Sequence, residues 1–142
     1  MISVNEVMST ELITLMPQDS VSKAAETMTN NNIRHIPIVD QNQHLVGIIS
    51  QRDVLKAGAL THHSSKTPLD FPVTEIMTKD ILTTHPKDSL RAAGLTLQKH
   101  KYGCLPVIDN GELVGIITDS DFVGVAINLI EEQDNFEDLG ND

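Results

Sequence analysis

A nine-residue pattern occurs twice in this chain and constrains the fold more than any other feature. The first copy runs from Leu45 to Asp53 and reads LVGIISQRD, and the second runs from Leu113 to Asp121 and reads LVGIITDSD. Five consecutive identities, a matched hydroxyl residue and a matched aspartate exceed what chance supplies in 142 residues. The pattern therefore indicates an internal duplication, in which two similar units pack together.

The repeat extends well beyond this pattern. At an offset of 69 positions Met8 aligns with Met77, and the match continues to a turn after Asp40, where the second copy has one residue fewer. The repeated unit covers roughly residues 7–57 and 76–126. A unit of about 50 residues buries too little surface to be stable alone, so we expect the two units to share a core. We predict a first unit at 1–58, a linker at 59–72 and a second unit, with an acidic C-terminal tail, at 73–142.

Residue periodicity predicts an α/β protein with the same order in both units: strand, helix, strand, strand, helix. Ser20 and Ser89 precede apolar residues at helical spacing, the pattern of a capped amphipathic helix. Asn110-Gly111 suits a tight type I′ hairpin turn, which explains the missing residue. The predicted strands lie at 11–15, 36–39 and 45–50 in the first unit and at 81–84, 104–108 and 112–118 in the second. The predicted final helix has Phe122, Ala126, Leu129 and Ile130 on one face and frays after Glu131.

Composition argues against several partners. A net charge of −10 at pH 7 would repel the phosphate backbone of nucleic acid, and aromatic residues make up only 3% of the chain. No apolar run approaches the roughly 18 residues of a membrane span, and no signal-peptide pattern follows Met1. The single cysteine, Cys104, permits no internal disulfide and fits a reducing compartment. We expect a cytoplasmic protein that binds neither nucleic acid nor a membrane.

The two segments Ser50–Asp53 and Thr118–Asp121 are the strongest candidates for a functional site. One interpretation is a capping box, in which the hydroxyl and the carboxylate three residues later cap the following helix, although Glu or Gln is the usual partner. The other interpretation is a nucleotide site. A helix start offers N–H groups and a positive dipole end to a phosphate, and an aspartate can accept from both ribose hydroxyls. Because the motif occurs twice after identical strands, we favour the nucleotide site.

The ordered pair of motifs resembles a tandem pair of CBS domains (cystathionine β-synthase domains), also called a Bateman module. Pro-Ile-Val-Asp at 37–40 and Pro-Val-Ile-Asp at 106–109 precede the predicted hairpin turn, and Gly-Ile-Ile-Ser/Thr-x-x-Asp follows it in each unit. The resemblance covers nearly the whole chain and implies two units packed about a pseudo-twofold axis. It also implies a regulatory module that binds AMP, ADP, ATP or S-adenosylmethionine between the units, requires no cofactor, forms a homodimer and acts on an unknown partner protein.

The resemblance assigns site residues by position. Ser50 with Asp53, and Thr118 with Asp121, would contact the phosphate and the ribose of a ligand. The residues that would line the base are Thr14 in the first unit, Thr83, Thr84 and Pro86 in the second, and the pairs Ile36-Pro37 and Leu105-Pro106.

The two copies differ in charge around the motif. The second has Asp119 beside Thr118, which disfavours phosphates, while Lys99, His100 and Lys101 could compensate from the preceding helix. We therefore predict that the first cleft prefers ligands with more phosphates and the second prefers AMP or adenosine-type compounds. The first copy offers Arg34, His35 and Arg52 to a phosphate, and the matched positions of the second hold Gly103, Cys104 and Ser120.

Other chemistries have weaker support. His62-His63 lie in the linker without a cysteine or carboxylate at ligand spacing, so we expect solvated histidines and no metal site. Cys104 lies in an apolar predicted strand, so we expect a buried thiol and not a nucleophile. No nucleophile–base pair supports a small hydrolase. The main alternative to a nucleotide sensor is a structural or interaction module with empty clefts.

Overall fold

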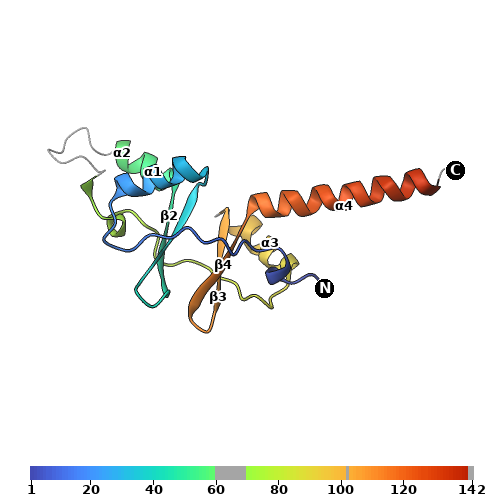
Figure 1. The fold of residues 1–142 in the computed structure, drawn as a ribbon, viewed down its shortest axis with the longest axis horizontal. Coiled ribbons are helices and arrows are strands. Elements are labelled where there is room, and N and C mark those ends of the chain that lie inside the picture. Colours follow the sequence, from blue (N-terminus) through green and yellow to red (C-terminus); the bar gives the residue numbers. More distant parts are fainter. Residues whose placement is uncertain (60–69, 102, 141–142) are drawn as a thin grey trace.

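The computed structural model describes residues 1–59, 70–101 and 103–140, which form a mixed α/β protein with two similar units side by side (Figure 1). Each unit has a two-stranded antiparallel hairpin, with one helix before it and one after it. This order of helices and hairpin strands confirms the predicted duplication. The elements are the short 3₁₀ helix η1 (Val4–Glu6), α1 (Val21–Asn31), β1 (His35–Val39), β2 (Leu45–Ser50), α2 (Gln51–Ala59), the short 3₁₀ helix η3 (Val73–Glu75), α3 (Leu90–His100), β3 (Cys104–Asp109), β4 (Glu112–Thr118) and α4 (Asp119–Gly140).

The two hairpins have the same register, as a duplication requires. β1 pairs with β2 through Ile36 and Ile49, and β3 pairs with β4 through Leu105 and Ile117. All four side chains are buried, so the apolar strands of the pattern supply the centre of each unit. Each hairpin also has an irregularity in its pairing at the matched position, Ile38/Val39 in one and Val107/Ile108 in the other.

Local signals for helix starts and turns are confirmed. Ser20 and Ser89 each accept the backbone N–H of the residue three positions on, at 3.0 Å, and so cap α1 and α3. The second hairpin turns at Asn110 (φ 52°) and Gly111 (φ 80°), the left-handed pair that a type I′ turn needs.

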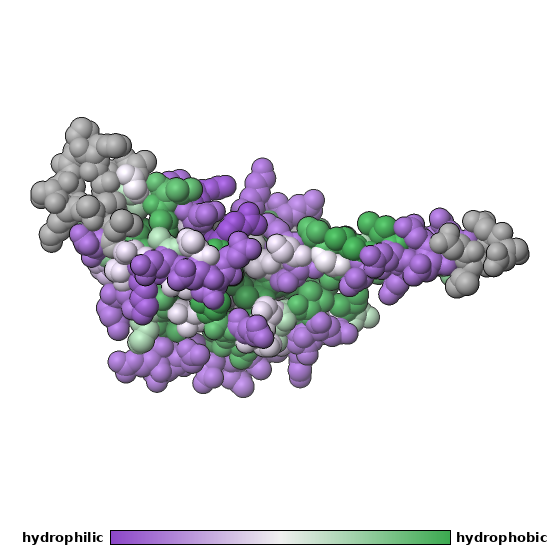
Figure 2. Space-filling view, turned by 45° about the horizontal axis from the view of Figure 1, so that its top comes forward, coloured by the Kyte–Doolittle hydropathy of each residue, from purple (hydrophilic) through white to green (hydrophobic). Residues whose placement is uncertain are grey.

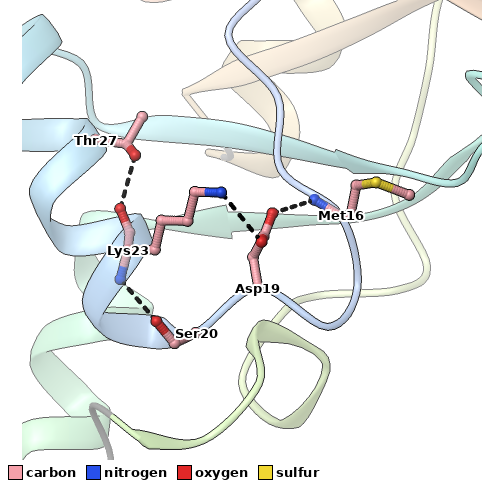
Figure 3. Close-up of polar contacts among 5 residues, drawn as sticks. All are labelled: Met16, Asp19, Ser20, Lys23 and Thr27. Carbon is pink, nitrogen blue, oxygen red and sulfur yellow. Dashed lines mark hydrogen bonds and ion pairs between the residues drawn. The ribbon is translucent and has the colours of Figure 1, made fainter.

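The first predicted strand of each unit is reduced to a single parallel bridge. Leu15 forms the bridge in the first unit and Thr84 in the second, and the chain then turns away. In the first unit Pro17 has no N–H for further pairing, and the Asp19 carboxylate accepts the N–H of Met16 at 2.8 Å (Figure 3). The matched aspartate of the second unit makes the same contact. The element lies where it was predicted but is shorter, because these turn contacts replace the strand ladder.

Each unit completes its hydrophobic core with a segment from the other half of the chain. Val4 is fully buried in the core of the second unit, and Val73 is fully buried in the core of the first. We call residues 3–9 and 72–78, which carry these valines, the N-terminal strap and the central strap.

Strap contacts are reciprocal between the two halves. Ser9 of the N-terminal strap bridges Ile116 on β4, and its counterpart Thr78 of the central strap bridges Ile48 on β2. Reciprocal contacts of this kind are what a twofold relation between two units produces. The predicted pseudo-twofold packing is therefore built on exchanged straps.

The straps explain the glycine of the repeated pattern. A Cβ on Gly47 would lie 2.5 Å from Sδ of Met77, and a Cβ on Gly115 would lie 2.5 Å from Sδ of Met8. The strap methionines pack so closely on the hairpins that only a residue without a side chain fits beneath them.

The last helix is longer than predicted. α4 is helical from Asp119 to Gly140 and projects beyond the rest of the molecule (Figure 1), so the predicted fraying after Glu131 is wrong. No proline or glycine stands between Gly124 and Gly140 to interrupt the helix, and this absence outweighs the acidic composition of its last turns.

Only the start of α4 packs against the body. Phe122 contacts the second core and lies over Gly94, where a Cβ would be 2.8 Å from its ring. Leu129 and Ile130, predicted on the same apolar face as Phe122, are 55% and 59% exposed, because the helix has left the body by then. Apolar residues are visible along the projecting helix in Figure 2. Among the described helices, α4 included, none has both the length and the apolar character that crossing a membrane requires.

Candidate ligand-binding clefts

Two clefts lie beside the starts of α2 and α4. Cleft A, of about 560 Å³, is lined by residues 50–53 and by residues within 78–81. Cleft B, of about 300 Å³, is lined by Thr118 and Asp121 and by residues within 9–13. Each cleft therefore joins the repeated motif of one unit to a segment from the other half of the chain that continues from the strap. We call these segments, 78–81 in cleft A and 9–13 in cleft B, the strap ends. The strap bridges to β2 and β4 bring these segments together.

Both motifs form capping contacts at the helix starts. Asp53 Oδ2 accepts the N–H of Ser50 at 2.8 Å, and Ser50 Oγ accepts the N–H of Asp53 at 3.1 Å. Asp121 Oδ2 accepts the N–H of Thr118 at 2.8 Å and its hydroxyl at 3.3 Å. The capping interpretation is therefore confirmed in full for the first motif, whereas in the second, among the described residues, only the aspartate half of the capping box is found. It is compatible with ligand binding, because both aspartates also line the clefts and Oδ1 of each accepts no hydrogen bond from the described residues.

The first N–H group at each helix start is already bonded. The N–H of Gln51 donates to the carbonyl of Arg34 at 2.8 Å, and the N–H of Asp119 donates to the carbonyl of Gly103 at 3.2 Å. The first N–H group of each helix is therefore not among those that could meet a ligand. A phosphate in either cleft would depend in larger part on cationic side chains.

Cleft A is the more cationic of the two. Cleft B contains Arg34 and the carboxylates of Glu11 and Asp121. Lys101 and Asp119, expected beside the second motif, both line cleft A instead. The reason is that Asp119 lies against Gly103, where a Cβ would be 3.3 Å from Asp119 Oδ2. The charged residues that line cleft A are Arg34, Arg52, Lys56 and Lys101, against Asp53, Asp80 and Asp119.

Of the residues assigned to the base, only Pro37 lines a cleft, and it lines cleft B. Ile36, Leu105 and Pro106 are less than 2% exposed and belong to the cores. The extended segments pass the clefts earlier, within 9–13 and 78–81, and then turn beneath the hairpins. The residues that line neither cleft for this reason are Thr14, Thr83, Thr84 and Pro86.

Three charged lining residues were missed by the reasoning from sequence. Glu11 in cleft B and Asp80 in cleft A are matched positions of the repeat, both acidic. Lys56 stands four residues after Arg52 on α2, which places the two side chains on the same helical face. The acidic pair at matched positions could have been noticed in the sequence. The exchange of straps, which places each acidic residue in its cleft, could not be predicted from neighbouring residues.

Cys104 is a buried thiol at the start of β3. It is 2% exposed, and burial, followed by the charges of Asp119 and Asp121, raises the pKa of its thiol to about 12. The thiolate that a nucleophile needs is therefore absent at neutral pH. The expected buried thiol is confirmed.

No group of three or more histidine, cysteine, aspartate or glutamate side chains within residues 1–59, 70–101 and 103–140 could hold a metal ion. His62-His63, which raised the question of a metal, lie outside the described residues. His35 lies at the wall between the clefts, where a Cβ on Gly103 would be 3.2 Å from its Cε1 atom.

The model of the CBS domain matches this chain twice, at residues 4–60 and 73–128. The chain belongs to the CBS domain family. The two matched stretches contain the repeated pattern, the hairpins and both clefts' motifs, so the resemblance inferred from sequence is confirmed.

Solved structures of CBS pairs have the same fold. The crystal structure of a proposed acetoin utilization protein (AcuB) from Vibrio cholerae is 44% identical, with a TM-score of 0.83, and the match covers 95% of this chain and 97% of that one. The CBS domain pair of protein MJ0100 in complex with 5′-methylthioadenosine and S-adenosyl-L-methionine is 30% identical, with a TM-score of 0.80 over 89% of this chain and 97% of that one. CBSX2 in complex with AMP is 30% identical, with a TM-score of 0.79 and the same coverage.

Longer proteins also contain stretches similar to this chain. This chain spans 41% of protein MJ1225 of Methanocaldococcus jannaschii, at 31% identity, and 23% of the homoserine O-acetyltransferase of Methanococcoides burtonii, at 36% identity. The chain thus spans less than half the length of these relatives, and the similarity concerns the matched part of each.

Proposed function

We propose that this CBS pair is a regulatory module that binds an adenosyl ligand in clefts A and B. The observation that carries the proposal is that, in both units, a hydroxyl residue and an aspartate at a helix start line a cleft. The AMP bound to CBSX2, and the S-adenosyl-L-methionine and 5′-methylthioadenosine bound to MJ0100, support an adenosyl group. The candidate ligands are AMP, ADP, ATP and S-adenosylmethionine.

In this proposal Asp53 and Asp121 hold the ribose. Each carboxylate is oriented by a backbone N–H at 2.8 Å and has Oδ1 left to accept from a ribose hydroxyl. A phosphate in cleft A meets Arg52, Lys56 and Lys101. The proposal retains the prediction that cleft A prefers more phosphates and that cleft B prefers a ligand of low negative charge.

Regulation follows from the way in which each cleft is built. Because the motif and the strap end in each cleft come from different halves of the chain, a bound ligand contacts both halves and favours one relative arrangement. A partner protein that binds one arrangement better than another would read this shift. The module itself needs no catalytic group, so we propose no enzyme activity.

Thermal shift measurements with AMP, ADP, ATP and S-adenosylmethionine test the proposal. A ligand that binds only the folded protein raises the melting temperature, by an amount that grows with ligand concentration. Mass spectrometry of small molecules released from protein purified without added nucleotide should detect an adenosyl compound. Absence of any shift and of any released adenosyl compound would favour the alternative, an interaction module with empty clefts. Turnover of the added nucleotide would favour a hydrolase.

We further propose that the protein is a homodimer. Leu55 on α2 and Val123 on α4 occupy matched positions of the repeat and are 68% and 58% exposed, and Ile127 is 50% exposed. Exposed apolar residues gathered on helices mark surfaces that a partner covers. A second copy of the chain presents the same helices and can cover them symmetrically.

The similar protein from Vibrio cholerae suggests which process is regulated. Its description as a proposed acetoin utilization protein, together with 44% identity along almost the whole of both chains, supports a partner in acetoin utilization. We place this regulation in the cytoplasm, where reducing conditions keep Cys104 a thiol. Deletion of the gene should change growth on acetoin as the carbon source and leave growth on glucose unchanged. Equal growth of both strains on acetoin would contradict this choice of process.

A further inference from the structure

Clefts A and B share one wall. Among the described residues, the three that line both clefts are Arg34, His35 and Gly103. Arg34 immediately precedes β1, and Gly103 immediately precedes β3 at the position that matches Arg34 in the repeat. The twofold arrangement therefore brings the two matched positions together at the partition between the clefts.

Gly103 limits the partition to one arginine side chain. It has φ 75°, and a Cβ at this position would lie 3.2 Å from His35 Cε1 and 3.3 Å from Asp119 Oδ2. A second arginine at the matched position would meet these atoms and an unfavourable backbone conformation. The backbone of Arg34 is anchored, because its carbonyl accepts the N–H of Gln51 at 2.8 Å. The repeat thus places one guanidinium, not two, between the clefts.

The two clefts depend on this guanidinium unequally. Without Arg34, cleft A keeps Arg52, Lys56 and Lys101. Cleft B keeps no other lysine or arginine among the described residues, and its charged groups are then the carboxylates of Glu11 and Asp121. An anion in cleft B therefore needs Arg34, whereas an anion in cleft A does not.

We propose that Arg34 is a shared contact that couples the clefts, so that an anionic adenosyl ligand in cleft A weakens the binding of a second one in cleft B. This inference rests on the proposed function. A phosphate in cleft A attracts the guanidinium and adds negative charge at the partition, and the second anion then meets the two carboxylates of cleft B. A neutral adenosyl ligand needs no guanidinium, so it binds the two clefts independently. The coupling is reciprocal, because it is an equilibrium property of the two sites.

Calorimetric titration of the full chain with AMP and with adenosine measures this coupling. In Asp53→Asn the amide oxygen still caps α2 but the charged ribose acceptor of cleft A is lost. In the wild-type protein the second AMP enters cleft B when cleft A is already filled. Cleft B of the variant should bind AMP about 5- to 150-fold more tightly than that second step. The affinity of cleft B for adenosine should be the same in both proteins.

Substitution of each of the three arginines of the chain in turn distinguishes a specific role of Arg34 from the effect of losing any one positive charge. Arg34→Gln should weaken AMP binding in cleft B about tenfold or more, leave adenosine binding unchanged and abolish the AMP coupling. Arg52→Gln should weaken AMP only in cleft A. Arg91→Gln makes the same change in net charge on an exposed position of α3 that lines neither cleft, and should behave as the wild type.

Several results would overturn the inference. The first is that cleft B binds AMP with the same affinity whether cleft A is filled or blocked. The second is that the second AMP binds more tightly than the first. The third is that Arg34→Gln changes AMP binding no more than Arg91→Gln does. Independent binding of AMP to the two clefts would refute the coupling and leave the proposed function intact. If no adenosyl compound bound at all, the proposed function and the coupling would both be refuted.

Discussion

Gly47 and Gly115 determine how closely the straps approach the hairpins. Each glycine lies under a methionine side chain of a strap. A backbone carbonyl of the same strap is also close to each glycine: a Cβ on Gly115 would be 3.2 Å from the carbonyl oxygen of Ser9. The methionine can move, but the carbonyl belongs to the bridge between Ser9 and Ile116 and can shift only by weakening that bridge.

Gly115→Ala should therefore destabilise the protein by about 1–3 kcal/mol, the usual range for overpacking. The control is Gly124→Ala on α4, where a Cβ meets nothing within 4 Å, and which should stabilise by about 0.5–1 kcal/mol as alanine replaces glycine in a helix. Urea unfolding followed by circular dichroism measures both. Equal midpoints for the two variants would show that the strap does not pack as described.

The Cys104 thiol should react slowly in the folded protein. Its pKa is raised to about 12 by burial and by the two nearby aspartates, so the folded state binds the proton more tightly than the unfolded state does. The resulting stabilisation is complete below the unfolded pKa of the thiol and is lost as the pH rises toward the folded pKa. At about pH 8 a thiol reagent should label native protein far more slowly than protein in urea. Rapid native labelling would contradict a buried thiol.

At the scale of elements, the sequence predicted the helix starts and the hairpin turn, because contacts between neighbouring residues determine them. Ser20 and Ser89 cap helices, and Asn110-Gly111 turns a hairpin, because each acts through neighbours within a few residues. The motif side of each cleft was found for the same reason. The strap ends were not found, because nothing in the sequence near residues 3–9 shows that this strap packs on the other unit.

The straps should contribute to the free energy of unfolding, although they lie outside the α-helices and the hairpins. Val4→Ala and Val73→Ala each remove apolar atoms from a fully buried side chain and should cost about 1–3 kcal/mol. Leu95→Ala, at a position on α3 that is 48% exposed and outside the proposed dimer surface, is the control and should cost clearly less. Thermal unfolding that leaves Val4→Ala indistinguishable from this control would mean that the N-terminal strap is not part of the second core.

α4 illustrates where composition misled the prediction. The acidic residues after Glu131 suggest a solvated, frayed end, yet the segment contains no proline or glycine before Gly140 and is helical to that residue. Charge disfavours the end of a helix only weakly, whereas a proline or glycine would have ended it.

At the scale of the whole molecule, the projecting α4 and its exposed apolar residues lead us to expect a dimer. Light scattering at micromolar concentration should give twice the chain mass of 15.6 kDa. Ile127→Glu places a charge on the proposed contact and should shift the protein toward the monomer. Leu82→Glu, at a 41% exposed position outside α2 and α4, should leave the dimer intact. A wild-type protein that scatters only as a 15.6 kDa species would contradict the dimer.

The central claim is that clefts A and B bind adenosyl ligands through the aspartate of the repeated motif, Asp53 in cleft A and Asp121 in cleft B. Calorimetric titration with AMP and S-adenosylmethionine on Asp53→Asn, Asp121→Asn and the double variant tests it most directly. The matched control is Asp88→Asn. The pKa of Asp88 is lowered by hydrogen bonds from the backbone of His85 and the hydroxyl of Thr84, and Asp88 lines neither cleft.

We predict that each single variant loses one binding step, with affinity in that cleft reduced about ten- to a hundredfold, because a charge-assisted hydrogen bond contributes about 1.5–3 kcal/mol. The double variant should lose both steps, and Asp88→Asn should keep both. Unchanged affinities and stoichiometry in the double variant would show that neither aspartate holds a ribose and would contradict the account.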